Sequence, residues 1–182
     1  MKKLLLLSLA STLVLFGCSS TNSSMASSYG AAAMSDSGIA SIVTTANQGE
    51  IDQANAALTK ATSSDVRDFA QMMIRDHTNA LNNTQSYIAS HSVTPTDNST
   101  STALRSGSQQ TITALNTYSG TNFDRAYMQA EVDEHQWLLN TMDSTLIPSA
   151  HTRALRDLLQ AQRTTVAAHL DRARTILNGL PQ

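Results

Sequence analysis

Three of the five histidines in the sequence occupy positions that could support metal chemistry. His77, His135 and His169 each lie on an apolar stripe of helical spacing, which predicts that their imidazoles face the interior of a helical bundle. Two carboxylates accompany them: Glu131 lies on the same helix face as His135, and Glu50 lies on a further predicted helix. Neutral imidazole and carboxylate are good ligands for zinc, iron and copper. These residue types therefore point to a site that could hold one metal ion.

The same five residues have a second interpretation that needs no metal. A buried histidine commonly shares a hydrogen bond with a carboxylate or a hydroxyl group, because buried polar groups need partners. A network of glutamates and histidines would meet this need within the core. The sequence leaves both alternatives open and does not choose between zinc, iron and copper. His91 and His151 lie near predicted helix ends in polar surroundings, and we expect neither of them in the site.

Five segments with an apolar repeat of helical period must position these side chains. No segment of the sequence shows the alternation that is typical of a strand. We therefore predict an all-α fold, an antiparallel four-helix bundle with one additional short helix in the long connection. The expected helices cover residues 37–61, Ser63 or Ser64 to the region of Pro95, 99–118, about Thr121 to Leu146, and 150–178.

The candidate ligands lie near the middle of the four long helices of this scheme. At ~1.5 Å per residue, none of them is expected more than about 10 Å from the midplane of the bundle. Four helices could thus direct three imidazoles and one or two carboxylates into one layer. The sequence contains no arrangement of serine or cysteine with histidine that is typical of a catalytic nucleophile, and no glycine-rich phosphate loop.

The segment that precedes the fourth predicted helix carries several local signals. Gly120 is expected to end the short helix, and Thr121 and Asp124 have the spacing of a capping box. Asp124 is therefore predicted to cap its own helix and to stabilise its N-terminal dipole. Tyr127 is predicted to face inward beside Phe123, where its hydroxyl group needs a hydrogen-bond partner.

The first 18 residues resemble the leader of a bacterial lipoprotein. Lys2 and Lys3 precede an apolar run over residues 4–15, which is too short to span a bilayer as a helix. Leu15-Phe16-Gly17-Cys18 then matches a lipobox, so we expect cleavage after residue 17 and acylation of Cys18. Ser19 stands where aspartate would favour retention in the inner membrane, which favours the periplasmic face of the outer membrane. The alternative is an ordinary secretory signal.

Composition limits what the rest of the chain can do. Residues 18–36 are rich in serine and threonine and are predicted to form a flexible tether, with the helical domain over residues 37–180. The chain has 12 basic and 14 acidic residues, and Lys2 and Lys3 belong to the leader, so that the remainder is acidic. Nucleic acid is therefore not an expected partner. The expected partners are the membrane, through the lipid anchor, and other envelope proteins.

Several short segments occur in an order that resembles a known bacterial family. These segments are Ala46–Ile51, Val66–Met73 followed by Asp76 and His77, Gly120–Tyr127, His135, and His169 with Leu170. Together they resemble the family called domain of unknown function 4142, whose members are often labelled predicted outer-membrane or periplasmic proteins. The resemblance covers about residues 38–178 and implies a ferritin-like helical bundle. Asp76, Phe123, Asp124 and Tyr127 belong to these segments and are expected to have structural roles.

A di-iron centre is not expected in this chain. Di-iron bundles carry Glu-x-x-His on two helices, whereas Ile74 precedes His77 by three residues and Val166 precedes His169 by three. Glu131 precedes His135 by four residues rather than three. A carboxylate-bridged iron pair would therefore lack ligands.

Three function hypotheses follow from these observations. The leading hypothesis is a non-catalytic envelope lipoprotein, a binding or protective module whose histidine and glutamate layer is structural or holds one metal ion. The second is a metal-dependent oxidoreductase or a metal-storage protein that uses the same layer. The third is a structural partner protein that docks other envelope components through an exposed apolar face.

Overall fold

The computed structural model describes residues 34–181. The predicted leader, Cys18 and nearly all of the predicted tether lie outside the described residues. Among the helices of residues 34–181, none is long and apolar enough to cross a membrane.

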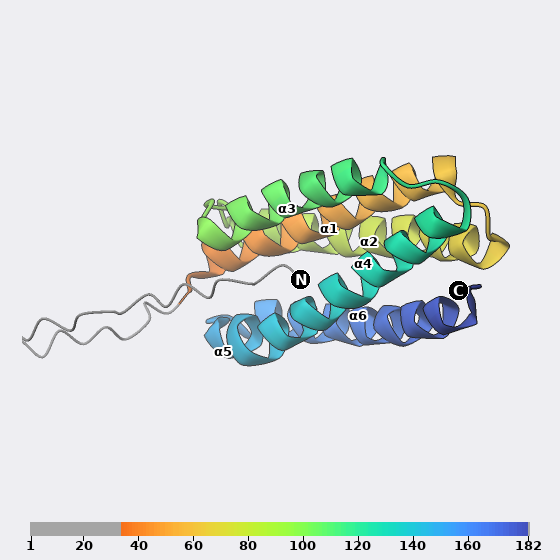
Figure 1. Ribbon diagram of the computed structural model, residues 1–182. Helices are drawn as coiled ribbons and strands as arrows, with labels where there is room; N and C mark the ends of the chain where they lie inside the picture. The colour runs from red at the N-terminus through yellow and green to blue at the C-terminus, as the bar shows by residue number, and fades with distance from the viewer. Residues whose placement is uncertain (1–33, 182) are drawn as a thin grey trace, which may run out of the picture. The chain divides into compact units, whose positions relative to one another are not determined.

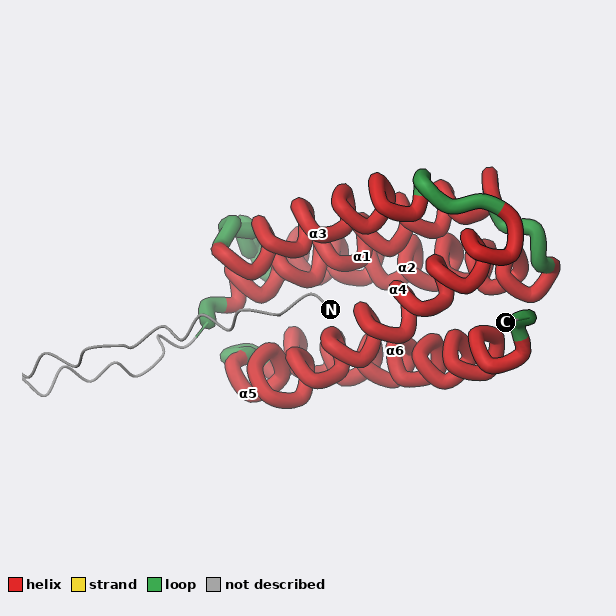
Figure 2. Tube along the Cα trace, in the orientation of Figure 1, coloured by secondary structure: helices red, strands yellow, loops and turns green. Residues whose placement is uncertain are grey.

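The described chain is helical and contains no strand, which confirms the predicted all-α fold (Figures 1 and 2). Four long helices and one shorter helix account for most of it, and a π-helical turn, η1, with a short helix, α5, follows the fourth. The elements are α1 (Asp36–Lys60), α2 (Ser64–Ser90), α3 (Ser99–Leu115), α4 (Gly120–Thr141), η1 (Met142–Leu146), α5 (Ile147–Ser149) and α6 (Arg153–Gly179).

The helices pack as two groups that share one interior. Helix α1 packs against α2 and α3, α4 packs against α6, and α2 joins the two groups through its contact with α6. Figure 1 shows α3 lying along α1, in the connection between α2 and α4. Only Ser101 and Leu115 of α3 are buried, so that α3 covers α1 while the other four helices enclose the core.

Side-chain caps start three of the helices where short polar residues precede an apolar stripe. Ser35 Oγ accepts from the Gly38 amide at 3.1 Å, and Thr152 Oγ1 accepts from the Leu155 amide at 3.2 Å. Asn98 forms a capping box with Ser101 at the start of α3. Each of these caps satisfies amide groups that the first turn of a helix leaves without a partner.

The prediction for the start of the fourth helix was wrong in two respects. The short helix ends at Leu115, and Gly120 instead opens α4 with a φ of 57°, a conformation that favours glycine. Asp124 does not cap its own helix. Its carboxylate accepts from the backbone amides of Thr62 at 3.0 Å and Ser63 at 2.9 Å, and also from the Thr62 hydroxyl group. It therefore fixes the turn immediately before α2, whose own N-cap, Ser63, makes no side-chain capping bond.

The fourth helix was predicted to run to Leu146, but its regular α-helical geometry ends at Thr141. After Thr141 the helical path widens into the π-helical turn η1, continues through the short helix α5, and leaves helical geometry at Ala150. Pro148 lies in the first turn of α5, where its missing N–H costs no helical hydrogen bond.

The apolar core is divided into two clusters. One cluster centres on Phe69, Met73, Phe123 and Tyr127, and the other on Ile39, Ile42, Leu155 and Leu159. Each of the four enclosing helices contributes to both clusters. Between the two contributions, each helix carries buried polar side chains: Asn47, Glu50 and Gln53 on α1, His77 on α2, Glu131 and His135 on α4, and His169 on α6. We refer to these seven residues as the polar layer.

Candidate metal centre

The polar layer brings together three histidines that are far apart in the sequence. His77, His135 and His169 are 3%, 0% and 2% exposed, and each is supplied by a different helix. One ligand atom from each of the three lies within 4.8 Å of those from the other two. The ring centroids are 5.2 to 5.9 Å apart. The structure therefore places the three predicted histidines around one point in the core.

Asn47 determines the protonation pattern of His77. The Asn47 amide nitrogen donates to the Val43 carbonyl oxygen at 2.8 Å, so that Oδ1 of Asn47 is left as an acceptor. This Oδ1 lies 2.9 Å from Nδ1 of His77. Because an acceptor needs a donor, the hydrogen of His77 resides on Nδ1, and Nε2 carries the lone pair.

The other two histidines are oriented by the same kind of contact. Nδ1 of His135 donates to the backbone carbonyl oxygen of Glu131 at 2.9 Å. Nε2 of His169 donates to the carboxylate of Asp76 at 3.1 Å. Acceptors on one ring nitrogen fix the orientation of the imidazole and leave the other nitrogen as a base, as is usual for histidines that bind metals.

The three remaining ring nitrogens have no hydrogen-bond partner within residues 34–181. They are Nε2 of His77, Nε2 of His135 and Nδ1 of His169. Burying an unpaired acceptor is costly, and one water molecule has only two hydrogens to donate to three such atoms. A metal ion would satisfy all three lone pairs together.

Two carboxyl groups adjoin the histidines. Glu50, Glu131 and His135 form a second group whose ligand atoms lie within 4.8 Å of one another. Oε2 of Glu131 lies 3.4 Å from Nδ1 of His135, the nitrogen that carries the hydrogen. Glu50 Oε2 and both oxygens of Glu131 lack partners among the described residues. The pair of carboxyl groups therefore extends the site beyond the imidazoles.

Burial shifts the protonation of both kinds of group toward the neutral form. Burial, and then the charge of Glu134, raise the pKa of Glu131 to about 8. Burial, followed by the charges of Glu131 and Glu134, raises the pKa of Glu50 well above its ordinary value. Burial and the neighbouring histidines lower the pKa of His77 well below its ordinary value and that of His135 to about 3. At neutral pH without metal, the histidines are therefore neutral bases.

Opposing influences act on the protonation of His169. Burial lowers its pKa, while the hydrogen bond and the charge of Asp76 act in the opposite direction. Asp76 is partly exposed and also pairs with the Arg75 side chain at 3.1 Å. This contact gives Asp76, which the sequence predicted only as a structural residue, an orienting role in the site.

Tyr127 faces inward together with Phe123, as predicted, and both lie in the apolar cluster next to the polar layer. The Tyr127 hydroxyl group was expected to have a partner, but it has none in the described part of the chain. Burial, and then the charge of Glu131, raise the pKa of Tyr127 well above its ordinary value, so that its oxygen stays protonated. The Tyr127 hydroxyl group is therefore a buried O–H donor without a partner in the described chain, and it lies close enough to Glu131 for the carboxylate charge to shift its pKa.

The chain matches the model of a known family over residues 21–176, and this family is described as Domain of unknown function (DUF4142). The chain belongs to this family. A search of the curated proteins found no match, and a search of the solved structures also found none. The DUF4142 match covers α1 to α5 and most of α6, and it therefore includes every residue of the polar layer.

Two contributors to the site of this DUF4142 protein had no role in the sequence interpretation. Asn47 orients His77, and Gln53 donates to the Glu134 carboxylate at 2.8 Å. Asn47 and Gln53 lie three residues before and after Glu50 on α1, so that the helical spacing could have placed all three on one face. Their partners, however, lie on α2 and α4, and no sequence signal connects them.

Proposed function

We propose that this DUF4142 protein binds one transition-metal ion through His77, His135 and His169. The observation that carries the proposal is the convergence of three buried histidines, each of which has one ring nitrogen engaged by an acceptor and the other without a partner in the described chain. A set of imidazole ligands is suited to zinc, copper, iron or nickel rather than to magnesium or calcium.

A single ion is favoured over a pair. The three-histidine group and the group of Glu50 and Glu131 both depend on His135, and His135 has one nitrogen free to coordinate. Only one ion can use that nitrogen. We propose that the imidazoles are the primary ligands, and that Glu131 or Glu50 completes the coordination or neutralises the charge of the ion.

The proposed role is a non-catalytic binding or protective module of the bacterial envelope. The support for the envelope is the sequence at residues 2–18, with its lipobox at Cys18. We propose that an acyl anchor at Cys18 holds the domain at the periplasmic face of the outer membrane. Metabolic labelling with a radioactive fatty acid should mark the wild-type protein, and Cys18→Ser should abolish the label. A labelled Cys18→Ser variant would contradict the anchor.

Metal content is the test of the central proposal. The domain should be purified without chelators or affinity histidines and analysed by elemental mass spectrometry. We expect close to one equivalent of a transition metal per chain, lost in His77→Ala and His135→Ala. The matched control is His91→Ala, because His91 is an exposed histidine outside the layer. A folded wild-type domain that neither contains metal nor takes up added zinc, copper or iron would contradict the proposal.

The second candidate function is a metal-dependent oxidoreductase. It is favoured by one observation: a cavity of about 590 Å³ between α1, α3 and α4 reaches Glu50, so that a small molecule could approach the layer. Glu131→Ala should then abolish a metal-dependent activity without unfolding the bundle. If Glu131→Ala leaves both the metal content and every redox activity of the loaded protein unchanged, this candidate fails.

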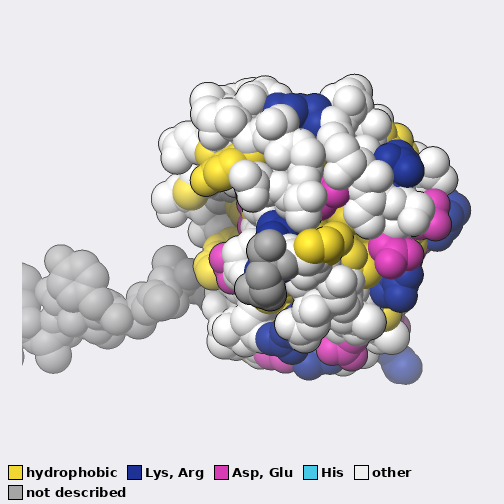
Figure 3. Space-filling view, turned by 45° about the vertical axis from the view of Figure 1, so that its right-hand side comes forward, with side chains coloured by type: hydrophobic (Ala, Val, Ile, Leu, Met, Phe, Trp, Pro, Cys, Tyr) yellow, Lys and Arg dark blue, Asp and Glu magenta, His cyan; other side chains and the backbone are white. Residues whose placement is uncertain are grey.

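The structural-partner alternative has less support. Of the large apolar side chains in the described residues, Tyr118 and Trp137 are the two that are exposed, at 46% and 45%. On the face in Figure 3, apolar side chains form small areas among charged and other polar groups. A broad apolar docking face is the feature that this alternative would require.

A further inference from the structure

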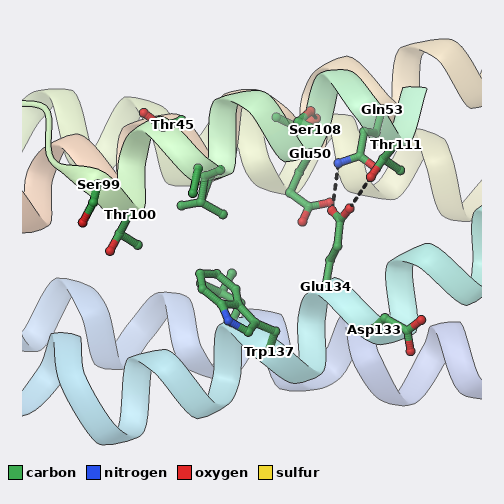
Figure 4. Close-up of a pocket in the computed structure, with 16 residues that line it drawn as sticks. Thr45, Glu50, Gln53, Ser99, Thr100, Ser108, Thr111, Asp133, Glu134 and Trp137 are labelled. Atoms are coloured by element: carbon green, nitrogen blue, oxygen red, sulfur yellow. Dashed lines mark hydrogen bonds between the residues drawn. The ribbon is translucent and has the colours of Figure 1, made fainter. Parts of the chain in front are cut away.

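A groove lies between α1, α3 and α4, beside the polar layer. Its volume of about 590 Å³ falls in the range of small-molecule sites. Its lining extends along α3 from Ser99 to Thr111, which corresponds to ~18 Å at 1.5 Å per residue. Figure 4 shows the side chains of α1 and α3 on one side and Trp137 and Glu134 of α4 on the other. The groove is therefore elongated, and Figure 4 shows Glu134 near one end and Trp137 farther along it.

Small residues keep the groove open. Ala46 and Gly49 of α1 and Ala103 and Gly107 of α3 all line it. At Gly49 the two helices approach so closely that a Cβ atom would lie 3.1 Å from the Ser108 side chain. Helix α3 thus stays on α1 and leaves space toward α4. Together with Leu104 and Leu138, the small side chains give the middle of the groove an apolar wall.

The inner end of the groove is built from buried acceptor atoms. Glu134 is held there by Gln53 Nε2 at 2.8 Å and by the Thr111 hydroxyl group at 3.0 Å. Gln53 is 2% exposed and Glu50 is 5% exposed, and Gln53 Oε1 and Glu50 Oε2 have no partner within the described chain. In Figure 4, Glu50 and Glu134 point toward each other across this end. The unpaired oxygen atoms call for a ligand that supplies several N–H donors.

The charge of the lining has one sign. Glu50 and Glu134 direct their carboxyl groups toward its inner end, whereas the Asp133 carboxylate points away from it in Figure 4, and none of the lining residues is lysine, arginine or histidine. Trp137 is the single tryptophan of the chain, and Figure 4 shows its indole extending from α4 into the space below α3. An indole face provides both apolar contact and attraction for a cation.

We infer that this groove binds a small organic cation, with a primary ammonium head at Glu134, Gln53 and Glu50 and an unbranched apolar tail along Trp137 and Leu104. The ammonium group matches the unpaired acceptors and the acidic charge, and the tail matches the length and apolar wall of the groove. The inference goes beyond the proposed metal site, and it is tested without metal because Glu50 belongs to both sites.

The single tryptophan allows a direct test. The metal-free domain is titrated in the presence of a chelator with hexylammonium, 1-hexanol and hexanoate, while Trp137 fluorescence is recorded and isothermal calorimetry measures the heat. We expect hexylammonium to bind at least tenfold more tightly than 1-hexanol, and hexanoate to bind most weakly. Equal affinity for hexylammonium and 1-hexanol, or no binding of hexylammonium at millimolar concentration, would overturn the inference.

Two isosteric variants locate the charge. Glu134→Gln should reduce the affinity for hexylammonium at least tenfold while the affinity for 1-hexanol stays within twofold. Asp133→Asn removes the same charge from the neighbouring residue, whose side chain accepts from Gln129 at 2.9 Å and points away from the groove in Figure 4. Its affinity for hexylammonium should stay within twofold of wild type. Equal losses in the two variants would mean that only overall charge matters, and would overturn the assigned head position.

A blocking variant locates the tail. No atom lies within 4 Å of the position that a Cβ of Gly107 would take, so that leucine can be accommodated on α3 while filling part of the groove. Gly107→Leu should reduce the affinity for hexylammonium at least tenfold and leave the helical circular dichroism signal unchanged. Unchanged affinity in a folded Gly107→Leu variant would place the ligand elsewhere and overturn the inference.

Discussion

The Nδ1 atom of His77 lies 2.9 Å from the Oδ1 atom of Asn47, and this contact joins α2 to α1 inside the core. The Asn47 side chain is itself anchored to the Val43 carbonyl oxygen. A chain of two hydrogen bonds therefore fixes the ring of His77 and the nitrogen that carries its hydrogen. Without Asn47, both properties would be lost.

Asn47→Ala should weaken metal binding about 10- to 100-fold, the usual effect of removing a partner that orients a ligand. Competition with a chromogenic chelator measures the affinity. Asn47→Asp keeps an acceptor for His77 and should stay within a few-fold of wild type. Asn55→Ala is the control for helix α1, because Asn55 makes the same bond to a backbone carbonyl, that of Ile51, at an exposed position. An Asn47→Ala affinity equal to that of Asn55→Ala would refute the orienting role.

The buried imidazole of His135 should contribute a loss of stability to the metal-free domain as the pH falls below about 6.5. Burial holds the pKa of His135 at about 3 in the folded protein, whereas an unfolded histidine titrates near 6.5. Between these values the unfolded state binds more protons than the folded state. Each such histidine therefore lowers the free energy of unfolding by up to about 1.4 kcal/mol for every unit by which the pH falls. Urea unfolding in the presence of a chelator measures this slope. His135→Gln should reduce the slope, and an unchanged slope would contradict the assignment.

Glu131 should contribute a slope of opposite sign between about pH 4.5 and 8, which partly offsets that of His135 below about pH 6.5. Its pKa is about 8 in the folded protein and about 4.5 when unfolded, so that between these values the folded state binds the extra proton. Stability is therefore lost as the pH rises from about 4.5 to 8. Glu131→Gln should flatten this part of the curve in the metal-free protein. A Glu131→Gln curve that runs parallel to the wild-type curve would show that the carboxyl group is already ionised.

Asp124→Asn should destabilise the bundle by about 1–3 kcal/mol without changing metal affinity. The amide can accept with only one atom, whereas the carboxylate accepts from Thr62 and Ser63 with both oxygens. Urea unfolding gives the change in stability. Asp133→Asn is the matched exposed control on the same helix and should remain within about 0.5 kcal/mol of wild type. A loss of metal affinity in a folded Asp124→Asn variant would mean that the two regions are coupled.

The two glycines of the groove should respond in opposite directions. Gly107→Ala should raise stability by about 0.5–1 kcal/mol, because alanine favours the helix and meets no neighbouring atom. Gly49→Val should lower it by about 1–3 kcal/mol, because its Cβ would lie 3.1 Å from Ser108 and would force α3 away from α1. Thermal unfolding distinguishes them. Stabilisation by Gly49→Val would show that α3 is free to move.

Much of the fold could be predicted from the sequence because the helices depend on local patterns of apolar residues. The apolar period places α1 and α6 within a few residues of their observed ends, and the inward positions of His77, His135 and His169 follow from the same period. The resemblance to the family was carried by segments of these same helices, and the match to the DUF4142 model confirms that the chain belongs to the family.

The features that the sequence did not predict depend on contacts between helices. Asp124 accepts from the backbone of the turn before α2, 61 and 62 residues earlier in the chain, whereas a local capping rule assigned it to its own helix. The role of Asp76 as a partner for His169 requires α2 and α6 to be neighbours. The groove arises from the spacing between α3 and α4, which no single helix encodes.

The division of the core by the polar layer also determines how the helices are aligned along their axes. Sliding any one helix by a turn, ~5.4 Å, would move its histidine or glutamate into an apolar cluster and bring an apolar side chain opposite the remaining polar groups. Purely apolar interiors discriminate weakly between such alignments, whereas a buried polar position specifies one. The seven residues of the polar layer therefore specify one axial register for the four enclosing helices, whether or not a metal ion is bound.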